Sequence, residues 1–231
     1  MRSAITIVAT ALIALTASTA FAQAASGSAK CRKAAKPGQV IAKGPKSLVF
    51  ELTHAPKILE DYFYGCHYKT GKAYRLPSQD GGDTLHPAHY VFRGDLLAYT
   101  VLDSEPAGQS AYRDVLLVNL RKRKRLTKAP AFSPPDNDPD VTVGASSAPS
   151  LLVDTRGYVA WIGRYRRKYK TSYNVQVAGG GGGKAQILDT GDGIASKSLR
   201  RSKDRGTLRW KKDGAARSAP FPPAVGGSAM P

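Results

Sequence analysis

The chain has 231 residues, with 35 Lys or Arg against 17 Asp or Glu, and its formal net charge at pH 7 is +18. This length suffices for one domain of generous size. The charge favours contact with polyanions, or else serves solubility alone. One apolar run stands at the start of the chain, and no other approaches the ~20 residues that cross a bilayer. The composition therefore argues against an integral membrane span in the mature chain.

Residues 1–24 are predicted to be a cleavable signal peptide. Met1 and Arg2 form a short basic start, and an uncharged, mostly apolar run follows from residue 4 to residue 17. Two A-x-A cleavage signals come next, Ala20-Phe21-Ala22 and Ala22-Gln23-Ala24, as signal peptides require. A membrane anchor is the alternative, but the run is short for a span. We expect a secreted or extracytoplasmic protein, and export argues against nucleic acid as its partner.

A basic leader, residues 25–38, contains the first of the two cysteines, Cys31, and the second is Cys66. An even number of cysteines in an exported chain predicts one disulfide. Closing a loop of this length stabilises by roughly 3–4 kcal/mol in the chain-entropy model. A metal or catalytic thiol is the alternative, but neither cysteine belongs to a C-x-x-C pair.

A faint internal repeat runs through the rest of the chain. A motif of apolar residue, any residue and aromatic residue recurs four times, with the aromatic residues 49, 62 and 49 positions apart. The copies are Leu48-Val49-Phe50, Leu97-Ala98-Tyr99, Val159-Ala160-Trp161 and Leu208-Arg209-Trp210. The longer spacing is explained by a proline-rich loop insertion, residues 129–150. Without that insertion the period is constant, which is typical of repeat architectures.

A second landmark keeps the same phase within each repeat. Leu76, Leu126 and Leu188 each follow a lysine by four residues, and Gly71 precedes the first of these lysines. A glycine there suits a hairpin turn with positive φ. The segments between the landmarks are β-branched and aromatic runs bounded by turn residues. We therefore predict nearly pure antiparallel β structure with four strands per repeat. The fourth copy would need its leucine beyond Pro231, so it is expected to be short by one strand.

These patterns resemble the blades of bacterial exported β-propellers of the Tol-associated and WD-like kind, and a group of uncharacterised actinobacterial secreted proteins. The resemblance rests on two pairs of segments, Gly94 to Tyr99 with Val118 to Leu126, and Gly157 to Trp161 with Tyr173 to Leu188. It implies an all-β, β-propeller-like domain of about four blades over residues 39–221, followed by a disordered tail, residues 222–231. A β-sandwich is the alternative. The resemblance implies no activity, because propellers host many functions.

No motif predicts catalysis, a metal site or a cofactor. Histidines and carboxylates gather at Asp80, Asp83, His86 and His89, but their spacing matches no established metal site, so loop residues explain them. Asp136, Asp138 and Asp140 alternate as in a calcium loop, yet Val141 stands where glycine is required. Gly179 to Gly183 with Lys184 lacks the flanking residues of a phosphate-binding loop, so it is interpreted as a long hairpin turn. We therefore predict no catalytic, metal or cofactor-binding residues.

The strongest unusual feature is basic. Arginines and lysines that could grip phosphates or carboxylates cluster in two segments, with tyrosines interleaved in the second. The candidate polyanion contacts are Arg121, Lys122, Arg123, Arg125, Arg164, Arg166, Arg167 and Lys168. Solvated hairpin tips are the alternative.

Three functional hypotheses follow from these observations. The first is an exported non-catalytic binding or scaffold protein that contacts an anionic envelope polymer or an acidic protein partner. The second is an extracellular polysaccharide hydrolase or lyase on a propeller scaffold, using Asp83, His86 or His89. The third is an interaction module whose open sheet edge takes a strand from a partner.

Overall fold

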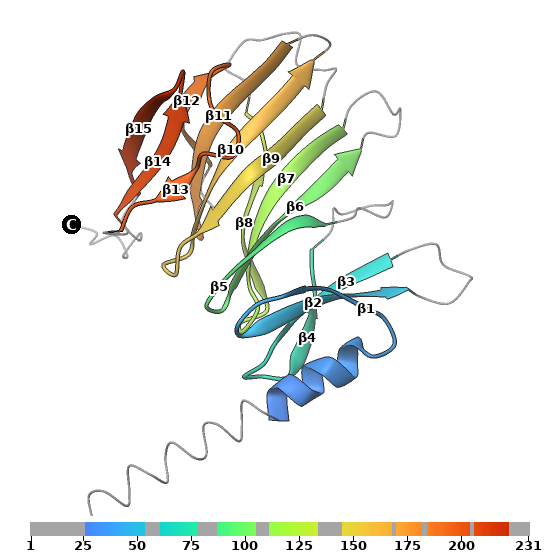
Figure 1. The fold of residues 1–231 in the computed structure, drawn as a ribbon. Coiled ribbons are helices and arrows are strands. Elements are labelled where there is room, and N and C mark those ends of the chain that lie inside the picture. Colours follow the sequence, from blue (N-terminus) through green and yellow to red (C-terminus); the bar gives the residue numbers. More distant parts are fainter. Residues whose placement is uncertain are drawn as a thin grey trace, which may run out of the picture. The chain divides into compact units, whose positions relative to one another are not determined.

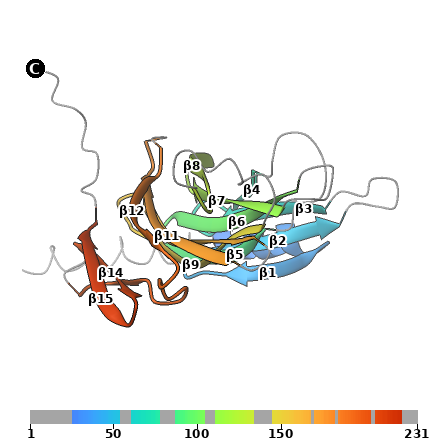
Figure 2. The ribbon, with the colours of Figure 1, turned by 90° about the horizontal axis from the view of Figure 1, so that it is seen from above.

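The computed structural model describes residues 26–53, 61–77, 87–104, 111–133, 145–167, 170–181, 184–203 and 206–221 (Figures 1 and 2). These residues belong to two compact units, one up to Leu76 and one from Pro77 onward. The predicted signal peptide, residues 1–24, and the predicted tail, residues 222–231, lie outside the described residues. No helix in the described part of the chain is long and apolar enough to cross a membrane.

The first unit is a four-stranded antiparallel sheet with a helix, residues 26–35, packed against it. Its strands lie in sequence order: β1 (Gln39–Lys43), β2 (Ser47–Thr53), β3 (Asp61–His67) and β4 (Lys72–Arg75). The buried cluster beneath the helix contains Leu48 and Phe50 of β2 together with Cys31 and Ala35 of the helix. Alternate residues of β2 therefore face the helix, as the two-residue period of a strand requires.

The second unit contains the other three repeats. The second repeat of the chain comprises β5 (Ala88–Arg93), β6 (Leu96–Ser104), β7 (Ala111–Asn119) and β8 (Lys124–Pro130). The third repeat comprises β9 (Ala145–Val153), β10 (Tyr158–Arg167), β11 (Lys170–Gly179) and β12 (Gln186–Gly191). A single parallel bridge, between Ala111 and Ala145, joins these two antiparallel sheets. The last sheet has three strands, β13 (Arg200–Arg201), β14 (Thr207–Lys212) and β15 (Ala215–Pro220).

The predicted fold class is confirmed: the protein is all-β, with antiparallel repeats of three or four strands and a propeller-like organisation. Each sheet is built from consecutive strands, whereas the strands of a Greek-key sandwich alternate between two sheets. The four motif aromatics all lie on the second strand of their sheet and are buried: Phe50, Tyr99, Trp161 and Trp210. In the described part of the chain the fourth repeat has three strands, one fewer than the other repeats, which agrees with the predicted short copy.

The middle sheet of the second unit, β9 to β12, is buried on both faces. Val159 and Trp161 of β10 belong to the core shared with the preceding sheet. Ala160 and Ile162 belong to the core shared with Leu208 and other residues of the last sheet. Sheets that stack face to face in this way are the packing unit of a propeller. This explains why the motif has apolar residues at consecutive positions, because neither face of the strand meets water.

A buried polar network fixes one sheet on the next. The carbonyl oxygen of Ala131, just after β8, accepts hydrogen bonds from Nε1 of Trp161 at 2.8 Å and from Nε2 of Gln176 at 3.2 Å. Ser133 donates to Oε1 of Gln176, and Nδ2 of Asn174 donates to the carbonyl of Ser133. Asn174 and Gln176 are fully buried. Because every buried amide in this network has a partner, the chain after β8 is tied to β10 and β11 without the cost of unsatisfied polar groups.

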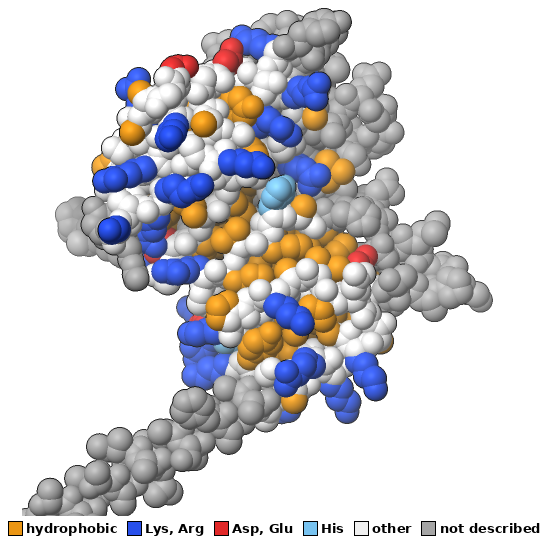
Figure 3. Space-filling model, in the orientation of Figure 1, with side chains coloured by type: hydrophobic (Ala, Val, Ile, Leu, Met, Phe, Trp, Pro, Cys, Tyr) orange, Lys and Arg blue, Asp and Glu red, His pale blue; other side chains and the backbone are white. Residues whose placement is uncertain are grey.

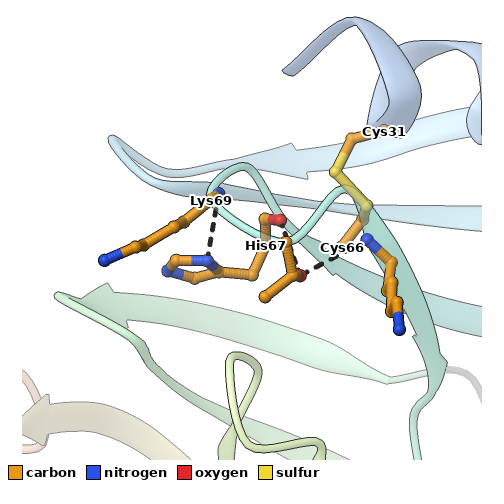
Figure 4. Close-up of a disulfide and its surroundings, with 6 residues drawn as sticks. Cys31, Cys66, His67 and Lys69 are labelled. Carbon is orange, nitrogen blue, oxygen red and sulfur yellow. Dashed lines mark hydrogen bonds between the residues drawn. A yellow bond between two sulfur atoms is a disulfide. The ribbon is translucent and has the colours of Figure 1, made fainter. Parts of the chain in front are cut away.

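The disulfide between Cys31 and Cys66 is confirmed (Figure 4). It joins the helix to the end of β3 and is completely buried. The expectation of nearly pure β structure is wrong for the basic leader, because residues 26–35 form an α-helix. The buried face of the helix consists of Gly27, Cys31 and Ala35, spaced four residues apart. Because all three residues are small, this face gives only a weak hydrophobic pattern in the sequence.

Candidate functional site

The hairpin between β7 and β8 presents the predicted run of cations in an ordered turn. Leu120 is buried and its backbone amide donates to the carbonyl of Asp95 at 2.9 Å. The amide of Lys122 donates to Oδ1 of Asn119 at 2.8 Å. These bonds hold the turn, while the side chains of residues 121–125 are exposed. Arg121 forms a 3.7 Å ion pair with Asp95 and remains 51% exposed, a surface pair of little energetic weight.

A cavity of 490 Å³ adjoins this hairpin, between β8 and the glycine turn that follows β11. Lys124, Arg125 and Lys128 line one side of it, and Gly180 and Gly181 line the other. Lys128 is paired with Asp114 at 3.2 Å, so Lys124 and Arg125 are the cations with most freedom to meet a ligand. The chemistry of this site, cations beside glycine backbone, suits anions such as carboxylate, sulfate or phosphate groups.

The predicted basic residues of β10 lie elsewhere on the same unit. Arg164 and Arg166 are exposed, and Nε of Arg164 donates to Oγ of Ser147 at 3.1 Å. Arg166 pairs with Ala145, which bridges to Ala111 at the start of β7. The hairpin lies beyond the opposite end of β7, a strand of nine residues, and therefore roughly 27 Å away along the sheet.

The two basic segments are thus separate surfaces rather than one. The side chain of Arg167 and all of Lys168 lie outside the described residues. Tyr165, interleaved with these cations in the sequence, is buried and stacks on Phe132 with ring centroids 5.3 Å apart, so its ring belongs to the core and not to a ligand surface. Lysine and arginine side chains far outnumber acidic ones on the face that Figure 3 displays.

Two carboxylates hold the last sheet in place, Asp154, which is fully buried, and Asp189, which is partly buried. Asp154 is fully buried and accepts from Nε and Nη2 of Arg156, at 2.9 and 2.7 Å, and from Nη2 of Arg201 on β13 at 2.7 Å. Burial alone would raise the pKa of Asp154, but the hydrogen bonds of Arg156 and the charges of Arg201 and Arg156 outweigh it and lower that pKa.

The second carboxylate, Asp189 of β12, accepts from Nε1 of Trp210 at 2.8 Å and from Nζ of Lys212 at 3.0 Å. Burial raises the pKa of Asp189, and the bonds from Trp210 and Lys212 more than offset it, so the pKa is lowered. A general acid needs a raised pKa. Both carboxylates therefore suit structural anchoring rather than acid catalysis.

The candidate catalytic and metal residues are mostly beyond what the structure describes. Asp80, Asp83, His86, Asp136, Asp138 and Asp140 lie outside the described residues. His89 lies in β5, exposed, with φ of 55°. Within the described ranges, no three or more His, Cys, Asp or Glu residues gather in a group that could hold a metal ion. The one deeply buried histidine found there is His67, whose Nδ1 accepts from the amide of Lys69 at 3.2 Å (Figure 4).

Comparison with known proteins adds little to the geometry. No protein family matches the sequence, and no curated protein does. Among solved structures, an endo-arabinase from Bacteroides thetaiotaomicron VPI-5482 aligns over 82% of this chain and 95% of its own, with 11% identity and a TM-score of 0.24. That is a weak likeness between two β-rich proteins.

Proposed function

We propose that this is an exported binding or scaffold protein that contacts an anionic envelope polymer through the β7–β8 hairpin. The observation that supports the proposal is the ordered turn that exposes residues 121–125, all cationic, beside a cavity. Backbone amides of Leu120 and Lys122 hold the turn, while the cationic side chains stay exposed, Arg121 with a weak surface ion pair to Asp95. A preorganised site binds more tightly than a flexible one, because less side-chain and loop freedom is lost on binding.

The alternative, that these cations serve only solubility, makes a different prediction about salt. Generic charge attracts any polyanion, and added salt screens that attraction within a Debye length of about 8 Å at physiological ionic strength. A shaped site adds direct hydrogen bonds to its charge, and these persist at higher salt. The retention of the protein on its polymer across a salt series therefore separates the two.

The test compares two variants with the same loss of charge. One carries Lys122→Gln, Lys124→Gln and Arg125→Gln in the hairpin. The control carries Arg164→Gln, Arg166→Gln and Lys170→Gln at the opposite end of the strands. Both are measured on immobilised envelope polymer beside a basic protein of similar charge. We expect the hairpin variant to elute at distinctly lower salt than the wild type, and the control to elute close to the wild type. Equal shifts in the two variants would mean that only net charge matters.

A further inference from the structure

The helix of the first unit is docked rigidly on the sheet. The Cys31–Cys66 disulfide joins it to β3, with Cα atoms 5.7 Å apart. At Gly27 a Cβ atom would lie 1.6 Å from the carbonyl oxygen of Tyr68, so the helix backbone rests directly on the turn after β3. At Gly71, where φ is 62°, a Cβ would lie 2.9 Å from the side chain of Lys30. Only glycine permits such close approach.

This docking creates a second cavity, of 580 Å³, between the C-terminal half of the helix and β1. Three cations at the helix end, Arg32, Lys33 and Lys36, line it together with Lys43 from β1. All four are exposed. No acidic residue occurs among the described residues that line the cavity. The site is therefore strongly electropositive, and the sequence alone did not single out any of these four cations as a candidate contact.

Part of this charge has a structural explanation. Cations at the C-terminal end of a helix complement its partial negative charge, which accounts for Lys33 and Lys36. It does not account for Lys43, which lies on a strand. Arg32 and Lys36, the residue that follows the helix, are like charges four positions apart, and like charges at this spacing repel each other. An anion in the cavity would relieve that repulsion.

Apart from Ser28 and Gly38, the rest of the lining is apolar or aromatic. Leu48, which is 1% exposed, Val40 and Ala35 line the cavity, and Tyr68 lines it from the turn after β3. A ligand that uses the whole cavity must combine negative groups with an apolar surface, as binding pockets generally do with a few polar groups set in apolar walls. A sugar ring offers an apolar face of C–H groups, whereas inorganic polyphosphate offers none.

We propose that this cavity binds a short stretch of an anionic polysaccharide, a chain whose sugars carry carboxylate, sulfate or phosphate groups. The four cations contact the anionic groups, and Tyr68 with the apolar floor contacts the face of one sugar ring. The site goes beyond the hairpin function proposed above, because none of its residues belongs to the hairpin or to the cavity beside it.

The experiment is titration calorimetry of the oxidised mature chain with short oligogalacturonates, beside neutral galactose oligomers of the same length. The hairpin variant described above serves as the background for every protein compared, which weakens binding at that surface equally in all of them. The test variant carries Arg32→Gln with Lys36→Gln. The matched control carries Lys46→Gln with Lys72→Gln, two exposed lysines of the same unit that do not line the cavity. A further variant, Tyr68→Leu, tests the aromatic contact.

We expect the cavity variant to bind oligogalacturonate about tenfold more weakly, the size that two exposed ion pairs can supply, and the control to stay within about twofold. Tyr68→Leu is expected to weaken binding with little change in its salt dependence. Equal losses in the test and control variants would overturn the proposal, and so would equal binding of the neutral oligomer. Because three of the five hairpin cations are neutralised in every protein compared, neither result bears on the hairpin.

Discussion

The Asp154 cluster offers the sharpest test of how the last sheet is held. In Asp154→Asn the side chain keeps its shape but loses its charge and one of its two acceptor oxygens, so the ion pairs with Arg156 and Arg201 are lost. Removing one partner of a buried ion pair costs about 3–5 kcal/mol. We expect about 3 kcal/mol here, because Arg201 and Arg156 are 17% and 36% exposed and can turn toward water. Asp192→Asn, at an exposed site, should cost within about 0.5 kcal/mol.

The stability difference between the wild type and Asp154→Asn should also depend on pH. The folded pKa of Asp154 is lowered from its ordinary value of 3.8, so its stabilisation is present above that value. It is lost as the pH falls through the folded pKa. The gap between the wild type and Asp154→Asn should therefore be full at neutral pH and shrink in strong acid.

Tryptophan fluorescence during urea unfolding measures this gap, because both tryptophans of the chain, Trp161 and Trp210, lie in the second unit. The reasoning is refuted if Asp154→Asn costs under about 1 kcal/mol at pH 7, or if its cost does not change with acid.

Two further substitutions test packing and backbone strain. Gly163→Ala should destabilise the second unit by about 1–3 kcal/mol, because the new Cβ would lie 2.0 Å from the carbonyl oxygen of Ala131 and 2.4 Å from Oδ1 of Asn174. Gly181→Ala, with open space around it, is its control in the same urea assay. Arg123→Gly should stabilise by about 1 kcal/mol, because Arg123 adopts φ of 53° and left-handed backbone is costly for any residue with a Cβ. A lower Tm for this variant would contradict the argument.

The repeat could be predicted because the motif marks the one strand of each sheet that is buried most deeply. Leu97 and Tyr99, or Val159 and Trp161, occupy alternate positions whose period the sequence displays directly. The short fourth repeat followed from the same phase. The helix was not predicted because the small residues Gly27, Cys31 and Ala35 on its buried face give no clear hydrophobic periodicity in the sequence.

The candidate sites were harder to predict for a geometric reason. Arg121 and Arg166 both stand in basic runs, and composition alone treats them alike. Only the register of β7, β9 and β10 shows that they lie at opposite ends of the strands. The cavity of the first unit depends on where the helix docks, which the disulfide and the glycine contacts decide. Its cations are unremarkable in the sequence, since each is one lysine or arginine among 35.

The Cys31–Cys66 bond also connects the cavity of the first unit with the redox state of the chain, because it fixes the helix that forms one wall. Thiols stay reduced in the cytosol and form disulfides only in oxidising compartments. A chain kept in a reducing compartment therefore has no covalent tie between the helix and β3. Without the bond, the helix that carries Arg32 and Lys33 is held on the sheet by packing alone. Oxidation is therefore expected to fix these cations beside Lys43, so the proposed cavity should bind anions more tightly in the oxidised chain than in the reduced one.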